Sequence, residues 1–212
     1  NVYVISNGIF ATEGEGTDHA LSLVRHVPLG GVNLSRIDAV NAVSREICAG
    51  KWSMDEAEAA LANVAIVGAS AGEGLGVSYL HWIVGDASRS IVVESRADGL
   101  HVVDDPVDVL ANQPSIEWHL ENLRSYVTAT SDFPANAQWG RAELAPYGAG
   151  AGMRGIPGDC YSPSRFVKAA YLNANYPEKS GEHDNVIRML RTLEGVAMVE
   201  GAARMGNGDF EK

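Results

Sequence analysis

Cysteine is scarce in this chain of 212 residues, which contains two, Cys48 and Cys160. Two cysteines are too few for a disulfide framework, and neither has further cysteine or histidine ligands at the spacing of a zinc site. We therefore interpret both as ordinary thiols of a cytoplasmic protein. The sequence predicts no metal ion and no cofactor.

Positive charge and long hydrophobic runs are also scarce. The 16 Lys and Arg residues stand against 27 Asp and Glu, which gives a formal net charge of −11. A nucleic-acid-binding protein needs a basic surface to neutralise phosphates, so this composition argues against such a partner. No apolar run approaches the roughly 18 residues that span a bilayer, and no signal-like segment opens the chain. The chain begins at Asn1 rather than at a methionine, as a fragment or a processed product would.

The first 65 residues combine short strands with a helical hairpin. Apolar runs predict strands at residues 2–5, 8–11 and 21–27. Ser35 with Asp38, and Ser53 with Glu56, have the spacing of a capping box, which predicts two helices between residues 35 and 64. The buried face of the second helix is expected to consist of Met54, Ala57, Leu61 and Val64.

A glycine-rich stretch at residues 68–76 is the best candidate for a domain boundary, which divides the chain into residues 1–65 and 66–212. An antiparallel meander should follow, with a hairpin turn at Asp98-Gly99. Its strands are expected at residues 79–84, 90–95 and 100–104. Helices are expected at 115–127, at 163–173 and after 184, and residues 128–147 should be irregular. The helix at 115–127 is expected to bury Ile116, Leu120, Leu123 and Val127. The last helix is expected to bury Val186, Leu190, Leu193 and Ala197.

The stretch Gly148–Asn173 places an arginine where a helix does not favour one. A glycine-rich loop leads into a helix for which Ser162 is a suitable N-cap and Pro163 a suitable first residue. Arg165 then lies in the first turn, where a cation opposes the helix dipole at a cost of up to about 1 kcal/mol. We expect either a carboxylate partner or a functional role to compensate.

Several other patterns allow two interpretations. The run Gly150-x-Gly152-x-x-Gly155 matches a dinucleotide fingerprint but lacks the strand before it and the helix directly after it. The six histidines are scattered, and we interpret them as core or surface residues. Cys160 is interpreted as structural, although its place near a helix start leaves a reactive thiol open. Asn112, in the loop before Gln113-Pro114, is either a turn residue or an amide donor that stabilises an oxyanion.

Three segments, at residues 80–94, 109–124 and 155–167, together resemble the choloylglycine hydrolase family, which includes conjugated bile acid hydrolases and penicillin V acylases. The segments contain Leu80-His81-Trp82, Ala111-Asn112-Gln113-Pro114 and Ser162-x-Ser164-Arg165-Phe166. The resemblance covers about residues 66–212. It implies an α+β fold, the αββα sandwich of N-terminal-nucleophile hydrolases, here incomplete and preceded by an additional α/β segment.

The resemblance also implies a mechanism. In this family an N-terminal cysteine attacks the amide while its own α-amino group serves as the base. An α-amine titrates near pH 7.7–8.0 and is therefore suited to that role. Asn112 matches the oxyanion-hole donor, and Arg165 matches the arginine beside the nucleophile. Because the first residue is Asn1, we expect the chain as written to lack turnover.

The implied substrates are glycine or taurine amides of bile acids, with penicillin V as the nearest alternative, and the implied assembly is a homotetramer. Residues 1–65 carry a second resemblance, through Arg25-His26-Val27-Pro28 and residues 31–41, to the soluble domain of threonine/serine exporters. The alternative function is therefore a non-catalytic cytoplasmic domain of an amino-acid exporter.

Overall fold

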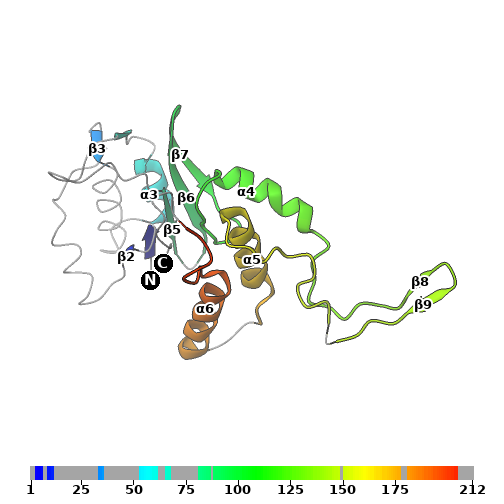
Figure 1. Cartoon of the computed structure of the whole chain (residues 1–212). Helices are drawn as coiled ribbons and strands as arrows, with labels where there is room; N and C mark the ends of the chain where they lie inside the picture. The colour runs from blue at the N-terminus through cyan, green and yellow to red at the C-terminus, as the bar shows by residue number, and fades with distance from the viewer. Residues whose placement is uncertain are drawn as a thin grey trace. The chain divides into compact units, whose positions relative to one another are not determined.

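The computed structural model describes residues 3–6, 9–11, 33–35, 53–61, 65–67, 81–86, 88–148, 150–177 and 181–204. The chain forms two compact units, Asn1–Leu110 and Ala111–Lys212 (Figure 1). The glycine-rich stretch at 68–76 and the strand expected at 21–27 lie outside the described residues. The division into residues 1–65 and 66–212 therefore stays a prediction.

The first unit contains a five-stranded sheet in which every neighbouring pair is antiparallel, in the order β2-β1-β5-β6-β7. Its strands are β1 (Tyr3–Ser6), β2 (Ile9–Ala11), β5 (His81–Gly85), β6 (Ser90–Arg96) and β7 (Gly99–Asp104). The predicted meander is confirmed, but its turn is displaced by one residue. Ala97 and Asp98 form the turn, while Gly99, with φ of 138°, already pairs with Arg96. Such a φ is strained for any residue with a Cβ atom.

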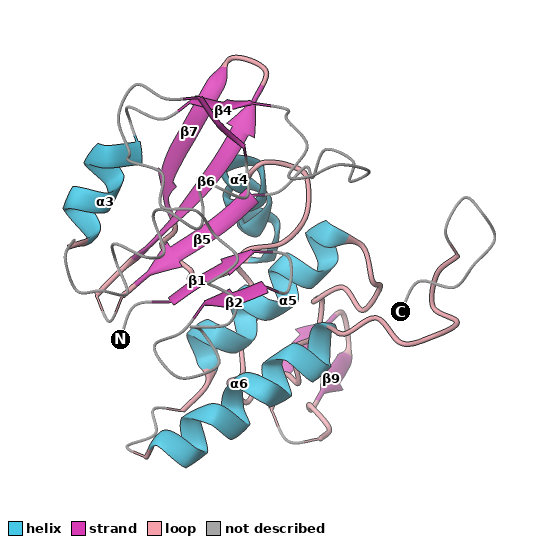
Figure 2. Cartoon of the chain, turned by 90° about the vertical axis from the view of Figure 1, so that its left-hand side faces the viewer, coloured by secondary structure: helices cyan, strands magenta, loops and turns pink. Residues whose placement is uncertain are grey.

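Helix α3 (Met54–Leu61) packs on this sheet (Figure 2). It begins as predicted, because the Ser53 amide donates to Glu56 Oε2 over 2.7 Å and the Glu56 amide donates to Ser53 Oγ over 3.3 Å. The core shared by helix and sheet consists of Met54, Ala57, Leu61, Trp82, Val84, Ile91 and Val93. Three of the four residues predicted for the buried helix face are therefore confirmed, and Val64 lies outside the described residues.

A short parallel pair, β3 (Asn33–Ser35) with β4 (Ala65–Val67), was not expected from the sequence. Ser35, predicted to cap a helix, is the last residue of β3. The helix expected after it lies outside the described residues.

The loop after β7 is organised by a buried carboxylate. Asp105 accepts hydrogen bonds from the backbone amides of Val107 and Val109 over 3.2 and 2.9 Å. Ser90 Oγ donates to Asp108 Oδ1 over 2.7 Å, and Asp108 adopts the left-handed conformation with φ of 55°. Removal from water raises the pKa of Asp105 to about 6, and the nearby charge of Asp108 adds to this effect.

The second unit contains three helices and a short hairpin. Its elements are α4 (Ile116–Leu123), the 3-10 helix η1 (Arg124–Tyr126), β8 (Ala137–Trp139), β9 (Ala142–Leu144), α5 (Ser162–Asn175) and α6 (Glu182–Val196). The β8–β9 hairpin corrects the expectation of an irregular segment at 128–147. Residues 131–145 are all exposed, and in Figure 1 the hairpin extends away from α4 and α5. A strand pair with no buried face has no hydrophobic alternation, so the sequence carried no signal for it.

Of the two stripes predicted to be buried in this unit, the one on α4 is wrong in part, and the one on α6 is wrong throughout, since Val186, Leu190, Leu193 and Ala197 are all exposed. On α4 the buried residues are Ile116 and His119, whereas Val127 is exposed. The chain changes to a 3-10 helix at Arg124, and its three residues per turn rotate Val127 away from the α-helical stripe. Helix α6 begins earlier than expected, with Gly181 as its N-cap, and has no buried residue. The large apolar side chains that it leaves exposed are Val186, Ile187, Met189, Leu190 and Leu193.

Candidate active site

The candidate site lies at the start of α5. The N-cap of this helix is Tyr161 rather than the predicted Ser162, and Pro163 occupies its first turn. Asp159 organises the turn that leads into the helix, since it accepts from the Tyr161 amide over 2.9 Å and from Ser164 Oγ over 2.7 Å. These hydrogen bonds, first that from the Ser164 hydroxyl, lower the pKa of the Asp159 carboxyl. The Ser162 hydroxyl therefore does not cap the helix, and it donates instead to the carbonyl oxygen of Asn112.

Arg165 connects this helix to the loop residue Asn112. Its Nη2 donates to Asn112 Oδ1 over 2.8 Å, and its Nε donates to the Cys160 carbonyl over 3.0 Å. The compensation expected for an arginine in a first helical turn is thus provided by two carbonyl oxygens instead of a carboxylate. The structure brings together the two residues, Asn112 and Arg165, that the sequence had selected.

The orientation of the Asn112 amide follows from the chemistry of its neighbour. A guanidinium has donors and no acceptor, so the amide atom that faces Arg165 must be the oxygen. The Nδ2 group then points away from the arginine, and no described residue accepts a hydrogen bond from it. The side chain is exposed. It therefore presents an N–H donor to any ligand that approaches this loop.

The backbone of Asn112 is also held. Its carbonyl oxygen accepts from His119 Nε2 over 2.8 Å and from the hydroxyl of Ser162. A carbonyl only accepts, so His119 must carry its proton on Nε2. His119 and Ser162 were not selected from the sequence. His119 lies three residues after Ile116 and therefore on the same face of α4. This spacing could have indicated that His119 is buried, but not which group it contacts.

Apolar packing holds the two helices that carry these groups. Phe166, Val167 and Ala170 of α5 and Ile116 of α4 are all buried. The His119 ring stacks on Phe166, with centroids 4.5 Å apart and planes inclined by 16°. The donors to Asn112 therefore come from a packed pair of helices rather than from mobile loops.

The other sequence candidates stay outside this arrangement. Cys160 contributes its backbone carbonyl, not its thiol, and has no disulfide partner. His101 is satisfied by Asp98 and Arg96 on the β6–β7 hairpin. The described part of the chain has no cluster of three His, Cys, Asp or Glu residues able to hold a metal ion. None of its helices combines the length and the apolar character needed to cross a membrane.

The glycine-rich loop before α5 has a packing role. Gly150 has φ of 86°, and a Cβ atom there would lie 2.7 Å from the backbone oxygen of Ser131, so only glycine fits. The Ala151 amide donates to the oxygen of Asp132 over 2.9 Å. Six residues separate Gly155 from the start of α5 at Ser162, so the loop does not open directly into that helix as a dinucleotide fingerprint requires.

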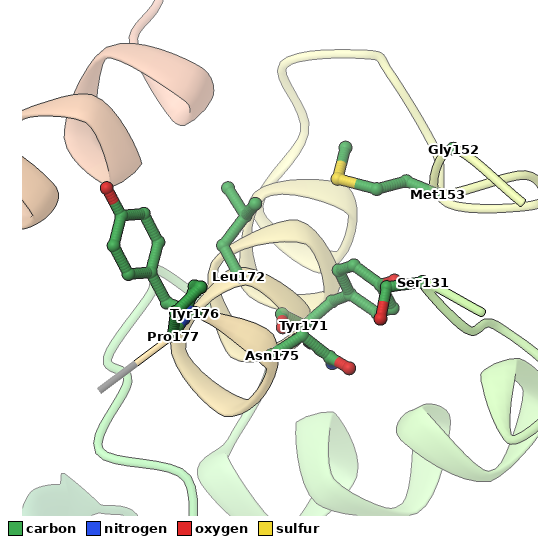
Figure 3. Close-up of a pocket in the computed structure, with 8 residues that line it drawn as sticks. All are labelled: Ser131, Gly152, Met153, Tyr171, Leu172, Asn175, Tyr176 and Pro177. Atoms are coloured by element: carbon green, nitrogen blue, oxygen red, sulfur yellow. Dashed lines mark hydrogen bonds between the residues drawn. The ribbon is translucent and has the colours of Figure 1, made fainter. Parts of the chain in front are cut away.

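A hollow of about 230 Å³ lies beside this loop, and Figure 3 shows the side chains around it. Its lining residues are Ser131, Gly152, Met153, Tyr171, Leu172, Asn175, Tyr176 and Pro177. Neither Asn112 nor Arg165 lines it. The hollow is therefore separate from the group of residues around Asn112.

Residues 35–212 match the profile of the family described as linear amide C–N hydrolases, choloylglycine hydrolase family. The chain belongs to this family. The resemblance drawn from residues 66–212 is thereby confirmed, and the match begins earlier, inside the segment that resembles an exporter domain. That second resemblance stays a prediction.

Several similar proteins are named as hydrolases of bile salts or of conjugated bile acids. The chain is 52% identical over 160 residues to a bile salt hydrolase/transferase of Bifidobacterium longum subsp. longum, covering 76% of this chain and 50% of the relative. It is 42% identical over 160 residues to a conjugated bile acid hydrolase of Lactobacillus acidophilus, covering 74% and 50%. The chain thus spans about half the length of these curated relatives.

The fold resembles that of a solved member of the family. A crystal structure of a variant conjugated bile acid hydrolase from Clostridium perfringens superposes with a TM-score of 0.72 at 30% identity, covering 88% of this chain and 56% of the other. The α+β class predicted from the sequence is confirmed, because the described residues combine an antiparallel sheet with helices.

Proposed function

We propose that this chain supplies the oxyanion-binding part of a hydrolase that cleaves linear amide C–N bonds. The observation that carries the proposal is the Asn112 amide, whose oxygen binds Arg165 and whose Nδ2–H group is exposed. A donor of this kind stabilises the negative charge that develops on a carbonyl oxygen during acyl transfer, and one such donor contributes roughly 3–4 kcal/mol.

The proposed chemistry follows the family mechanism. A thiolate attacks the amide carbon to form a C–S bond, and the carbonyl electron pair moves to the oxygen, which Asn112 stabilises. When the tetrahedral intermediate collapses, the C–N bond breaks and the amine leaves with the proton held by the α-amino group. Water then attacks the thioester carbon and gives up a proton, the C–S bond breaks, and the carboxylic acid leaves as the sulfur is restored to the thiol. Arg165 has two roles here, since it orients Asn112 and brings a permanent positive charge near the developing oxyanion.

The proposed substrates are glycine and taurine amides of bile acids, supported by the names of the relatives, with penicillin V as the alternative. We also propose that the antiparallel sheet is one layer of an αββα sandwich. Among the described residues no cysteine thiol contacts Asn112 or Arg165. The polypeptide of residues 1–212 should therefore release neither glycine nor taurine by itself.

A chimeric enzyme tests this function. The 160 aligned residues of the Bifidobacterium longum relative are replaced with those of this chain, and release of glycine and taurine from conjugated bile acids is measured by mass spectrometry. We expect the chimera to be active and Asn112→Ala to lower its kcat by roughly 10²- to 10³-fold. The control is Asn136→Ala, on the exposed segment before β8, which should leave kcat unchanged.

Full activity of the Asn112→Ala chimera would overturn the oxyanion role. Release of glycine or taurine by the polypeptide of residues 1–212 would overturn the expectation that it lacks turnover. Cleavage of penicillin V in preference to bile acid amides would replace the proposed substrate class with its alternative.

A further inference from the structure

The backbone oxygen of Asn112 accepts hydrogen bonds from two different helices, His119 Nε2 of α4 and Ser162 Oγ of α5. We propose that His119 and Ser162 are positioning residues that hold Asn112 so that its exposed amide faces the substrate oxygen. This inference rests on the function proposed above, because it concerns the same donor. Both side chains are buried, so the proposal gives them no contact with the substrate.

Asn112 needs such support because of its place in the chain. It lies in an exposed bend before α4, outside any helix or strand, so no regular backbone ladder holds it. Arg165 fixes only the side-chain oxygen. If the backbone moved, the amide would pivot around that single contact, and a displacement of about 1 Å in a reacting group costs roughly 10²-fold in rate.

The two donors use the full capacity of the carbonyl. A backbone oxygen has two lone pairs, and here one accepts from an imidazole and the other from a hydroxyl. With Arg165 on Oδ1, three hydrogen bonds fix both ends of the residue. The remaining polar group of the side chain, Nδ2, is the one that no described residue binds.

The burial of His119 supports a specific role. Only 1% of its surface is exposed, and its ring contacts both Phe166 and Trp118, with the Trp118 centroid 5.5 Å away. A phenyl ring would fill the same space without the cost of burying polar nitrogens. What an imidazole provides, and a phenyl does not, is the Nε2 donor to Asn112.

Two pairs of variants separate positioning from simple packing. His119→Phe keeps an aromatic ring against Phe166 but removes the donor, whereas His119→Gln retains an amide donor of similar reach. Ser162→Ala removes the second donor, and Ser162→Thr retains a hydroxyl. In each pair the first variant should disturb Asn112 and the second should restore it.

The first measurement is NMR of the isotope-labelled polypeptide of residues 1–212, which needs no catalytic activity. Loss of a donor should shift the Asn112 carbonyl ¹³C resonance and bring its two Nδ2 proton resonances closer together. Melting temperatures of the variants report whether the fold is retained. The second measurement is kcat and KM in the chimera, where His119→Phe and Ser162→Ala should each lower kcat roughly 10- to 100-fold with KM nearly unchanged.

Asn112 resonances that stay unchanged in both His119→Phe and Ser162→Ala would overturn the inference. So would changed resonances in an active chimera whose kcat is unaffected. An inactive wild-type chimera would instead contradict the proposed function, and the NMR shifts would then decide the positioning of Asn112 by themselves.

Discussion

At the scale of single residues, the buried carboxyl of Asp105 makes stability depend on pH. Its pKa is raised from 3.8 to about 6 in the folded chain. Below pH 3.8 both the folded and the unfolded states hold the proton. Above pH 3.8 the unfolded state releases this proton while the folded state still holds it. The stabilising contribution of the protonated carboxyl therefore decreases with rising pH and is lost once the folded state also releases its proton near pH 6. The free energy of unfolding should fall by about 3 kcal/mol across this window.

Asp105→Asn tests this prediction, because an amide oxygen still accepts from Val107 and Val109 but does not titrate in this range. Urea unfolding of the wild type and the variant should diverge between pH 4 and pH 7, with the variant the less sensitive to pH. Carboxyls with lowered pKa, such as Asp86 and Asp159, act in the opposite direction in both proteins and cancel in the comparison. Parallel pH profiles would contradict the prediction.

The residues of the candidate site were predictable to different extents. Arg165 was identifiable from charge, since a cation in a first helical turn needs a compensating contact. Asn112 was selected together with it through the family motifs. His119 and Ser162 were not, because their contacts with the Asn112 carbonyl join residues 7 and 50 positions apart. No local pattern encodes a hydrogen bond that depends on how two helices pack.

At the scale of elements, the capping box of α3 provides a separate prediction. Ser53→Ala removes the oxygen that accepts from the Glu56 amide. It should lower the free energy of unfolding by about 1 kcal/mol, as the loss of an N-cap usually does. Urea unfolding at neutral pH measures the change.

Glu56→Gln is the matched control, since glutamine also accepts from the Ser53 amide and completes a capping box. Its unfolding free energy should stay within a few tenths of a kcal/mol of the wild type. If Ser53→Ala and Glu56→Gln behaved alike, the capping explanation for the start of α3 would be wrong.

The elements predicted best are those with a buried face. The strands β5, β6 and β7 and the helix α3 follow from hydrophobic pattern and capping, because burial imposes a period on the sequence. The hairpin β8–β9 has no buried face and left no pattern. The stripe predicted across residues 115–127 failed at its end, where the helix tightens and its period changes.

At the scale of the whole molecule, the second unit exposes several large apolar side chains. Phe133, Trp139 and Tyr147 on and around the hairpin β8–β9 are at least 64% exposed. When such groups come together in one patch they mark an interaction surface. We predict a homo-oligomer, a tetramer as the family resemblance implies, in which this hairpin contributes to the contacts.

Light scattering coupled to size-exclusion chromatography measures the mass of the polypeptide. The double variant Phe133→Ser, Trp139→Ser should reduce the mass relative to the wild type. Val127→Ser, a similarly exposed apolar position outside the hairpin, should leave it unchanged. A wild-type chain that elutes as a monomer would contradict the prediction, and equal masses for the two variants would exclude the hairpin from the contacts.

The three groups that hold Asn112 can each donate their hydrogen bond without a change in protonation. A guanidinium stays protonated at any ordinary pH, a serine hydroxyl does not ionise, and an imidazole that donates through Nε2 does so whether neutral or charged. None of these three hydrogen bonds therefore requires its donor to gain or lose a proton. The Asn112 amide itself does not titrate either, so a pH optimum of an enzyme built on this site would have to come from other groups.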